Sequence, residues 1–485
     1  MSDLIKIGLD FGTHQTKICV RRTPDEGHGE PIYEFFKFRD QNDKEQYVLP
    51  SLIQVNKDDT LSYGYVNPNE RKGGVHHPVM DKSRLIDEKL DVLNLKKSLL
   101  QKYSRDDNAE EEAVVLDKML EYVKDKLHQI RQKQEKQDEE KYAEQMEAYR
   151  KNGNLYRYFK QATFAQRDWI EDTDPKILCI WYLAYIIFLL EDKYGQNFAI
   201  NMGIPTDNKN FVQKKQLAVE ILANAYQLVE NVFNNDKEAF LREKKTELLK
   251  KTKDNYVFYS DEVKYEYNIN VFPEAYAGLI SLTSKGKLAT GMSITVDIGG
   301  GTTDISFFTI QENKPVIYRY NSIARGLNYI AELSGFDYSN DDFGRYAKPE
   351  IIEKFNNKKL EIVSILRNDL SKQFSQETCL PKSRLYEALA NRIVVYMGGG
   401  SSYDFLTNGM AGFNDVHVID TSLWLEENIK DKAKVAPLCK LLTTAYGLSI
   451  SENDDDIKLE PFTTLFNNFP KYSAYGREYV DKDQC

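Results

Sequence analysis

The chain has 485 residues, of which 41% are hydrophobic and 29% are charged. These proportions are typical of folded globular proteins, and they exclude a wholly disordered chain, a collagen-like chain and a small disulfide scaffold. The formal net charge of −10 argues against a general electrostatic grip on nucleic acid or anionic lipid. We therefore expect no nucleic-acid partner.

The cysteines, the N-terminal segment and the apolar runs indicate in which cellular compartment the protein is expected. The five cysteines are scattered and odd in number, which is typical of reduced thiols. The segment Met1–Lys6 lacks the pattern of a secretory signal. The most apolar run, Ile177–Leu190, is shorter than the roughly 20 residues that cross a bilayer. We expect a cytoplasmic protein with no membrane partner.

Residues 4–20 predict a β-hairpin whose tip reads Asp10-Phe11-Gly12-Thr13-His14. Glycine leaves the backbone of such a turn uncovered, so phosphate oxygens can approach its N–H groups closely. We expect Asp10 to hold a hydrated Mg²⁺ ion, and Gly12 and Thr13 to bind phosphate. His14 is either a further phosphate donor or only a tolerated turn residue.

The middle of the chain predicts mainly helices. Residues 95–170 are rich in Gln, Lys and Glu around a short amphipathic seam, which predicts a helical insertion; it is either a partner-docking arm or a solvated subdomain. A buried helix is expected at 177–194, a buried strand at 198–204 and a core-facing helix at 211–233. The basic run 242–253 predicts a solvated helix or loop, because no aromatic residue interrupts it.

Residues 293–310 repeat the plan of the first hairpin. Their tip reads Asp297-Ile298-Gly299-Gly300-Gly301-Thr302-Thr303-Asp304, and a third strand is expected after each hairpin, at 32–38 and at 316–320. This duplication predicts two related lobes, each offering one polar tip to a shared cleft. Such tips would clamp a polyphosphate, with metal at Asp297 and phosphate contacts from Gly299, Gly300, Gly301, Thr302 and Thr303.

A third glycine cluster follows an apolar strand at Val394–Met397. Its residues Gly398, Gly399, Gly400 and Ser401 would let a flat base and ribose lie against the backbone. The phosphate-binding loop GxxxxGK[ST] occurs nowhere in the chain, and the spacing of a dinucleotide-binding fold is likewise absent.

The order of these segments resembles the actin-like ATPase superfamily, which includes actin, the seventy-kilodalton heat-shock chaperones, plasmid-segregating actin homologues and sugar kinases. The two tips resemble its two phosphate motifs and 394–402 its adenosine motif. Val271–Gly278 and Ala445–Leu448 resemble its two connecting segments. The resemblance implies a two-lobed α/β fold of duplicated ribonuclease-H-like domains: lobe I at 1–280 with the insertion, lobe II at 281–440, and a connecting helix and tail at 441–485.

The heat-shock ATPase module is the most similar member of the superfamily, without its peptide-binding domain. This resemblance implies ATP or ADP with Mg²⁺ as cofactors, Gly326 beside the nucleotide and catalytic roles for Asp10, Asp297, Glu274 and Thr302. Glu274 would polarise the attacking water, although a register shift would put Phe272 there. Ser83 stands where the chaperones carry a lysine near the transferred phosphate, which puts efficient hydrolysis in doubt.

The resemblance implies an ATPase that works as a nucleotide-driven conformational switch on a protein partner. An ATP-dependent filament of the plasmid-segregation type and a nucleotide-binding pseudoenzyme are the alternatives. A small-molecule kinase is disfavoured, because no sugar-kinase signature is present. Residues alone identify neither the partner nor the assembly state.

Overall fold

The computed structural model describes residues 4–24, 29–66, 155–165, 173–205, 210–283, 293–323, 393–402, 417–419 and 421–460, with single positions at 121–122, 125–126, 129, 286, 288 and 407. Contacts divide the chain into two compact units, Met1–Glu70 with Tyr156–Cys485, and Arg71–Leu155. Ser83, Gly326 and most of the expected insertion lie outside the described residues. Both large sheets and the helices packed on them belong to the first unit.

A mixed sheet forms the first half of this unit. Its central path runs in the order β11-β10-β1-β2-β3, and β6 pairs with β2 off that path. The neighbours β1, β2 and β3 are antiparallel, whereas β10 and β11 join β1 in parallel. The strands are β1 (Leu4–Phe11), β2 (Gln15–Thr23), β3 (Ile32–Phe35), β6 (Leu49–Pro50), β10 (Phe198–Ile204) and β11 (Ile269–Pro273).

A second mixed sheet repeats this arrangement. Its order is β16-β15-β12-β13-β14-β17, with β12, β13 and β14 antiparallel and β15 and β16 parallel to β12. The strands are β12 (Ser293–Ile298), β13 (Thr303–Gln311), β14 (Lys314–Ile323), β15 (Ile393–Met397), β16 (His417–Ile419) and β17 (Lys458–Leu459). Both hairpins and both third strands predicted from the sequence are confirmed, and the described chain is α/β.

Helices pack on the first sheet where their apolar residues require it. Helix α4 is buried along most of its length, because apolar residues occur on every side of it; Asp174 caps its first turn by accepting a bond from the N–H of Lys176 at 2.8 Å. The helices of this part are α3 (Phe159–Ala165), α4 (Pro175–Tyr194), α5 (Phe211–Tyr226), the π-helix η1 (Gln227–Val232), α6 (Lys237–Arg242), α7 (Lys245–Asp254) and α8 (Asp261–Glu266).

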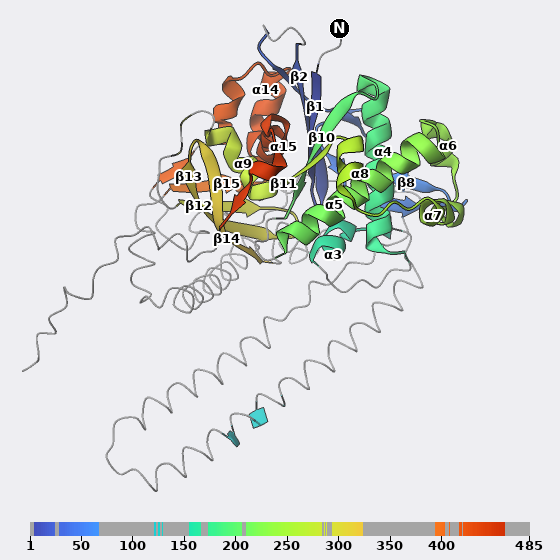
Figure 1. The fold of residues 1–485 in the computed structure, drawn as a ribbon, viewed down its shortest axis with the longest axis horizontal. Coiled ribbons are helices and arrows are strands. Elements are labelled where there is room, and N and C mark those ends of the chain that lie inside the picture. Colours follow the sequence, from blue (N-terminus) through green and yellow to red (C-terminus); the bar gives the residue numbers. More distant parts are fainter. Residues whose placement is uncertain are drawn as a thin grey trace, which may run out of the picture. The chain divides into compact units, whose positions relative to one another are not determined.

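Two helices connect the sheets. Helix α9 (Glu274–Thr283) leads from β11 toward β12, and α15 (Cys439–Ile450) contacts α9 and strands of both sheets (Figure 1). Their crossing is so close that a Cβ on Gly447 would lie 1.7 Å from the carbonyl oxygen of Ala277. A Cβ on Gly8 of β1 would lie 2.2 Å from the carbonyl oxygen of Ala445. Glycine is therefore required at both positions.

None of the helices in the described ranges is long and apolar enough to cross a membrane.

Shorter elements complete the described chain. These elements are β4 (Phe38–Arg39), β5 (Glu45–Gln46), β7 (Ile53–Val55), β8 (Leu61–Tyr63), β9 (Leu155–Tyr156), η3 (Gly399–Ser402), η4 (Thr421–Glu426), α14 (Lys432–Val435), η5 (Ala436–Leu438) and η6 (Asp454–Asp456).

Candidate functional site

A pocket brings the two hairpin tips together. Residues from the turn after β1 and from the turn after β12 both line it, as do the first residue of α9 and the turn after β15. Of the residues singled out from the sequence, twelve line this pocket: Asp10, Gly12, Thr13, His14, Glu274, Asp297, Gly299, Gly300, Gly301, Thr302, Gly398 and Gly399. Segments far apart in sequence thus meet at one concave site.

The first tip is fixed by a neighbouring loop. The hydroxyl of Ser51 donates to the carbonyl of Gly12 at 2.7 Å, and the N–H of Ser51 donates to the carbonyl of His14 at 2.9 Å. A Cβ on Gly12 would lie 2.2 Å from the carbonyl oxygen of Gln15, so only glycine fits this tight turn. These two bonds tie the first tip to the loop that carries Ser51.

Asp10 stands opposite Lys17 in the β1–β2 ladder. The Lys17 Nζ lies 2.9 Å from Asp10 Oδ2, and both side chains line the pocket while being largely buried. Asp297 occupies the corresponding place in β12, but its opposite residue in β13 is the acidic Asp304. The two hairpins therefore share a backbone plan and differ in charge.

The second tip turns through its three glycines. The N–H of Gly299 donates to the carbonyl of Thr302 at 2.9 Å, and the Thr302 hydroxyl donates to Asp304 Oδ2 at 3.2 Å. Thr303 is wholly buried at the start of β13 and does not line the pocket. Of the two threonines in the second tip, Thr302 is thus the one that lines the pocket.

The third glycine cluster packs against Asp297. Gly398 has a φ of +80°, and a Cβ there would lie 2.2 Å from Asp297 Oδ1. The chain then forms the short helix η3, in which Gly400 and Ser401 are buried and lie outside the pocket lining. Lys440 Nζ donates to the carbonyl of Ser401 at 2.9 Å. Gly398 and Gly399 are therefore the residues of this cluster that reach the site.

Glu274 carries the carboxylate that enters from α9. Its Oε1 lies 2.5 Å from the Nζ of Lys160, and the Lys160 side chain is only 4% exposed. Lys160 lies on α3 within the segment that we expected to be an insertion, yet residue 156 onward belongs to the first unit. Gln161, the next residue, also lines the pocket. A second lysine therefore reaches the site from an element that no sequence motif marks.

Burial and crowding of charge shift the titration of the site. Burial raises the pKa of Asp297 to about 8, helped by the nearby carboxylates Asp304, Glu274 and Asp10. Burial also lowers the pKa of His14 to about 4, with a contribution from Lys17, so His14 is neutral at pH 7. Burial opposes the charge on Lys160, but Glu274 and Asp10 outweigh it and raise the pKa of Lys160.

Asp10 and Asp297 are the pocket residues that could hold a hydrated cation. Within the described ranges, no group of three or more His, Cys, Asp or Glu side chains is placed to hold a metal ion directly. Asp10 and Asp297 come from separate strands and offer carboxylate oxygens, which suit Mg²⁺ that keeps most of its water. These two residues would bind such an ion through water molecules.

Several pocket residues carried no sequence signal strong enough to select them. Lys17 and Asp304 could have been found from hairpin register, since each stands opposite a selected aspartate. Lys160 and Gln161 follow only from tertiary packing. The remaining lining residues outside the motifs are Gln15, Phe164, Pro205, Lys214, Leu441 and Thr444.

No protein-family model matches the chain, and no curated protein is significantly similar to it.

Proposed function

We propose that the chain is a Mg²⁺-dependent, ATP-binding protein of the actin-like superfamily that hydrolyses ATP and acts as a conformational switch on a protein partner. One observation carries this proposal: two hairpin tips of the same plan, from two sheets of the same strand order, line one pocket. A polyphosphate held between such tips would contact both sheets at once.

The pocket has groups suited to each part of a nucleotide phosphate chain. Uncovered N–H groups at Gly12, Gly300 and Gly301 and the hydroxyls of Thr13 and Thr302 can donate to phosphate oxygens. The ammonium groups of Lys17 and Lys160 add positive charge. Bound Mg²⁺ would neutralise phosphate charge, and Asp10 and Asp297 would hold its water shell.

Glu274 and Lys160 suit the hydrolytic step. In that step a water oxygen forms a bond to the γ-phosphorus, the bond from that phosphorus to the ADP oxygen breaks, and the water proton passes to a base. Glu274 is a partly buried carboxylate whose pKa is raised by burial, with Lys160 opposing that rise, as a general base requires. Lys160 supplies the charge that Ser83 cannot supply.

The connection between the sheets supports the switch. Helix α9 begins at Glu274 in the pocket and crosses α15 closely at Gly447. A ligand that draws the two tips together would change how α9 packs on α15. A partner that binds one of these two packing arrangements more tightly would respond differently to ATP and ADP.

Phosphate release and light scattering on the same samples test the proposal. The purified full chain is mixed with ATP and Mg²⁺, with ADP as the control nucleotide. We expect phosphate release without assembly. Scattering that rises only with ATP indicates the filament alternative, and tight binding without phosphate release indicates a pseudoenzyme.

A further inference from the structure

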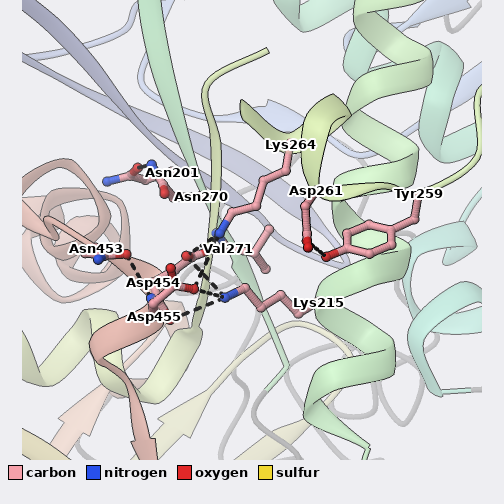
Figure 2. Close-up of polar contacts among 10 residues, drawn as sticks. All are labelled: Asn201, Lys215, Tyr259, Asp261, Lys264, Asn270, Val271, Asn453, Asp454 and Asp455. Carbon is pink, nitrogen blue, oxygen red and sulfur yellow. Dashed lines mark hydrogen bonds and ion pairs between the residues drawn. The ribbon is translucent and has the colours of Figure 1, made fainter. Parts of the chain in front are cut away.

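A buried carboxylate follows the connecting helix α15. The side chain of Asp454, in η6, is fully buried, and its Oδ1 lies 2.6 Å from the Nζ of Lys264 and 3.1 Å from the Nζ of Lys215. Figure 2 shows the two ammonium groups converging on Asp454 from α8 and α5. Burial opposes the charge of Lys264, but the hydrogen bond and charge of Asp454 outweigh it and raise the pKa of Lys264. Lys264 therefore keeps its positive charge at pH 7.

The second oxygen of Asp454 binds the edge of the first sheet. Its Oδ2 accepts a hydrogen bond from the N–H of Val271 at 2.9 Å (Figure 2). Val271 lies on β11, which among the described strands is at the edge of the first sheet and pairs with β10. A carboxylate therefore supplies the acceptor that an adjacent strand would otherwise supply. Three residues beyond Val271, the chain reaches Glu274 in the pocket.

The segment that carries Asp454 is fastened on both sides. At its start, the Asn201 side chain of β10 donates to the carbonyls of Leu448 at 2.7 Å and Ser451 at 2.9 Å. At its end, β17 pairs in parallel with β14 of the second sheet. Asp454 thus lies between an anchor on the first sheet and a strand of the second.

We propose that Asp454 is a positioning residue for Glu274: by holding β11 at Val271, it fixes the strand end that delivers the Glu274 carboxylate to the pocket. This role rests on the proposed function. A positioning role differs from a purely structural one, because substitution of Asp454 should then lower the turnover rate and leave the affinity for the nucleotide largely unchanged. Asp454 itself is absent from the pocket lining.

The chain contains a matched control in Asp455. This neighbour shares the same lysines, with Oδ1 at 3.2 Å from Lys215 Nζ and 3.6 Å from Lys264 Nζ, but its side chain is 60% exposed. Within the part of the chain that the structure describes, Asp455 makes no hydrogen bond to β11. Asp455→Asn therefore removes the same formal charge without touching the strand that leads to Glu274.

The test measures turnover, nucleotide affinity and amide hydrogen exchange for wild type, Asp454→Asn and Asp455→Asn. We expect Asp454→Asn to lower kcat about tenfold or more while Kd for Mg-ATP changes less than about threefold. We expect faster exchange in 269–272 in Asp454→Asn and in Asp454→Ala, which leaves no side-chain acceptor for the N–H of Val271, and wild-type behaviour in Asp455→Asn. Lys264→Gln leaves the bond from Val271 to Asp454 in place and tests the role even where the Asp454 variants fail to fold. Its kcat should stay within about threefold of wild type, and a loss of about tenfold overturns the positioning role.

The outcomes separate two failures. Equal kcat in wild type and Asp454→Asn, or equal losses in Asp454→Asn and Asp455→Asn, overturns the positioning role alone. Unchanged exchange in 269–272 in Asp454→Ala, which removes both carboxylate oxygens, shows that Asp454 does not hold β11, and also overturns the positioning role. A wild-type chain that neither binds nor hydrolyses ATP refutes the proposed function, whatever the exchange shows.

Discussion

Lys160 and Glu274 form a buried ion pair of 2.5 Å although 114 residues separate them. Lys160 Nζ also lies 5.6 Å from the ring centre of Phe11, next to Asp10 in β1. Both partners of a buried ion pair lose their hydration, so the pair adds little net stability. Removing one partner lowers the free energy of unfolding strongly, because the other charge stays buried and unpaired. The pair therefore links the stability of the first sheet to the chemistry of the pocket.

Removing Lys160 should destabilise the protein. Lys160→Met leaves Glu274 buried without its cation, and we expect the free energy of unfolding to fall by about 3 kcal/mol. The double variant Lys160→Met/Glu274→Leu should recover more than half of that loss. Arg39→Met is the control, because the Arg39 and Asp43 side chains are 63% and 78% exposed and such a pair is worth less than about 1 kcal/mol. Chemical denaturation measures all three; a Lys160→Met loss no larger than that of the control contradicts the expectation.

Asp297→Asn should stabilise the empty protein while impairing binding. The pKa of Asp297 is about 8 in the folded chain, against 3.8 for a free side chain, so the folded state holds a proton that the unfolded state releases between those values. Stability therefore falls as pH rises through this window, and a neutral amide removes that cost, which at pH 7 amounts to at least about 1 kcal/mol. Thermal unfolding without nucleotide checks this. A lower Tm in Asp297→Asn than in wild type would be the contrary result.

His14 predicts an acid-sensitive term of the opposite sign. Its pKa falls from 6.5 to about 4 on folding, so the unfolded state binds a proton in that window and the folded state does not. Stability is complete above pH 6.5 and declines on acidification toward pH 4, by up to about 3 kcal/mol. Denaturation of wild type and His14→Gln at a series of pH values isolates this term. Parallel curves for the two proteins would show that His14 contributes nothing.

The helix crossing should respond differently to two alanine substitutions. A Cβ on Gly447 meets the Ala277 carbonyl oxygen at 1.7 Å, whereas a Cβ on Gly278 meets the Met397 sulfur at 2.1 Å. A backbone carbonyl cannot move aside, but a methionine side chain can. We expect Gly447→Ala to cost at least about 2 kcal/mol more than Gly278→Ala. Denaturation measures both variants. Equal decreases in the free energy of unfolding would mean that the backbone at the helix crossing moves apart to accommodate the added methyl group.

Much of the fold follows from local sequence patterns. Both hairpins, strand 198–204 and the buried helix α4 were predicted because alternating or continuous apolar residues end at glycine turns or at caps such as Asp174. The basic run is helical at α7, as one of the two expected forms. The predicted helix 211–233 is only partly α-helical, since it passes into the π-helix η1 after Tyr226. A single wider turn leaves no signature in apolar spacing.

The pocket residues predicted from the sequence lie at the glycine turns and the strand ends before them, or, for Glu274, at the start of a connecting helix. The tips were found because glycines beside a carboxylate are unfavourable inside strands without a reason. Lys160 was missed because its partner is distant in sequence, and Asp454 because an acidic run normally indicates a solvated surface. Ser401 was selected from its motif, yet the turn into η3 buries it away from the pocket. Tertiary packing decides all three.

Calorimetric titration with ATP, with and without Mg²⁺, tests the central claim most directly. We predict one nucleotide bound per chain, with affinity that depends on Mg²⁺ and that falls well over about tenfold in Asp10→Ala and in Asp297→Ala. Asp455→Ala, which changes a residue that does not line the pocket, should bind as wild type does. If wild type binds no ATP, or if both pocket variants bind Mg-ATP as tightly as wild type, the pocket is not a nucleotide site.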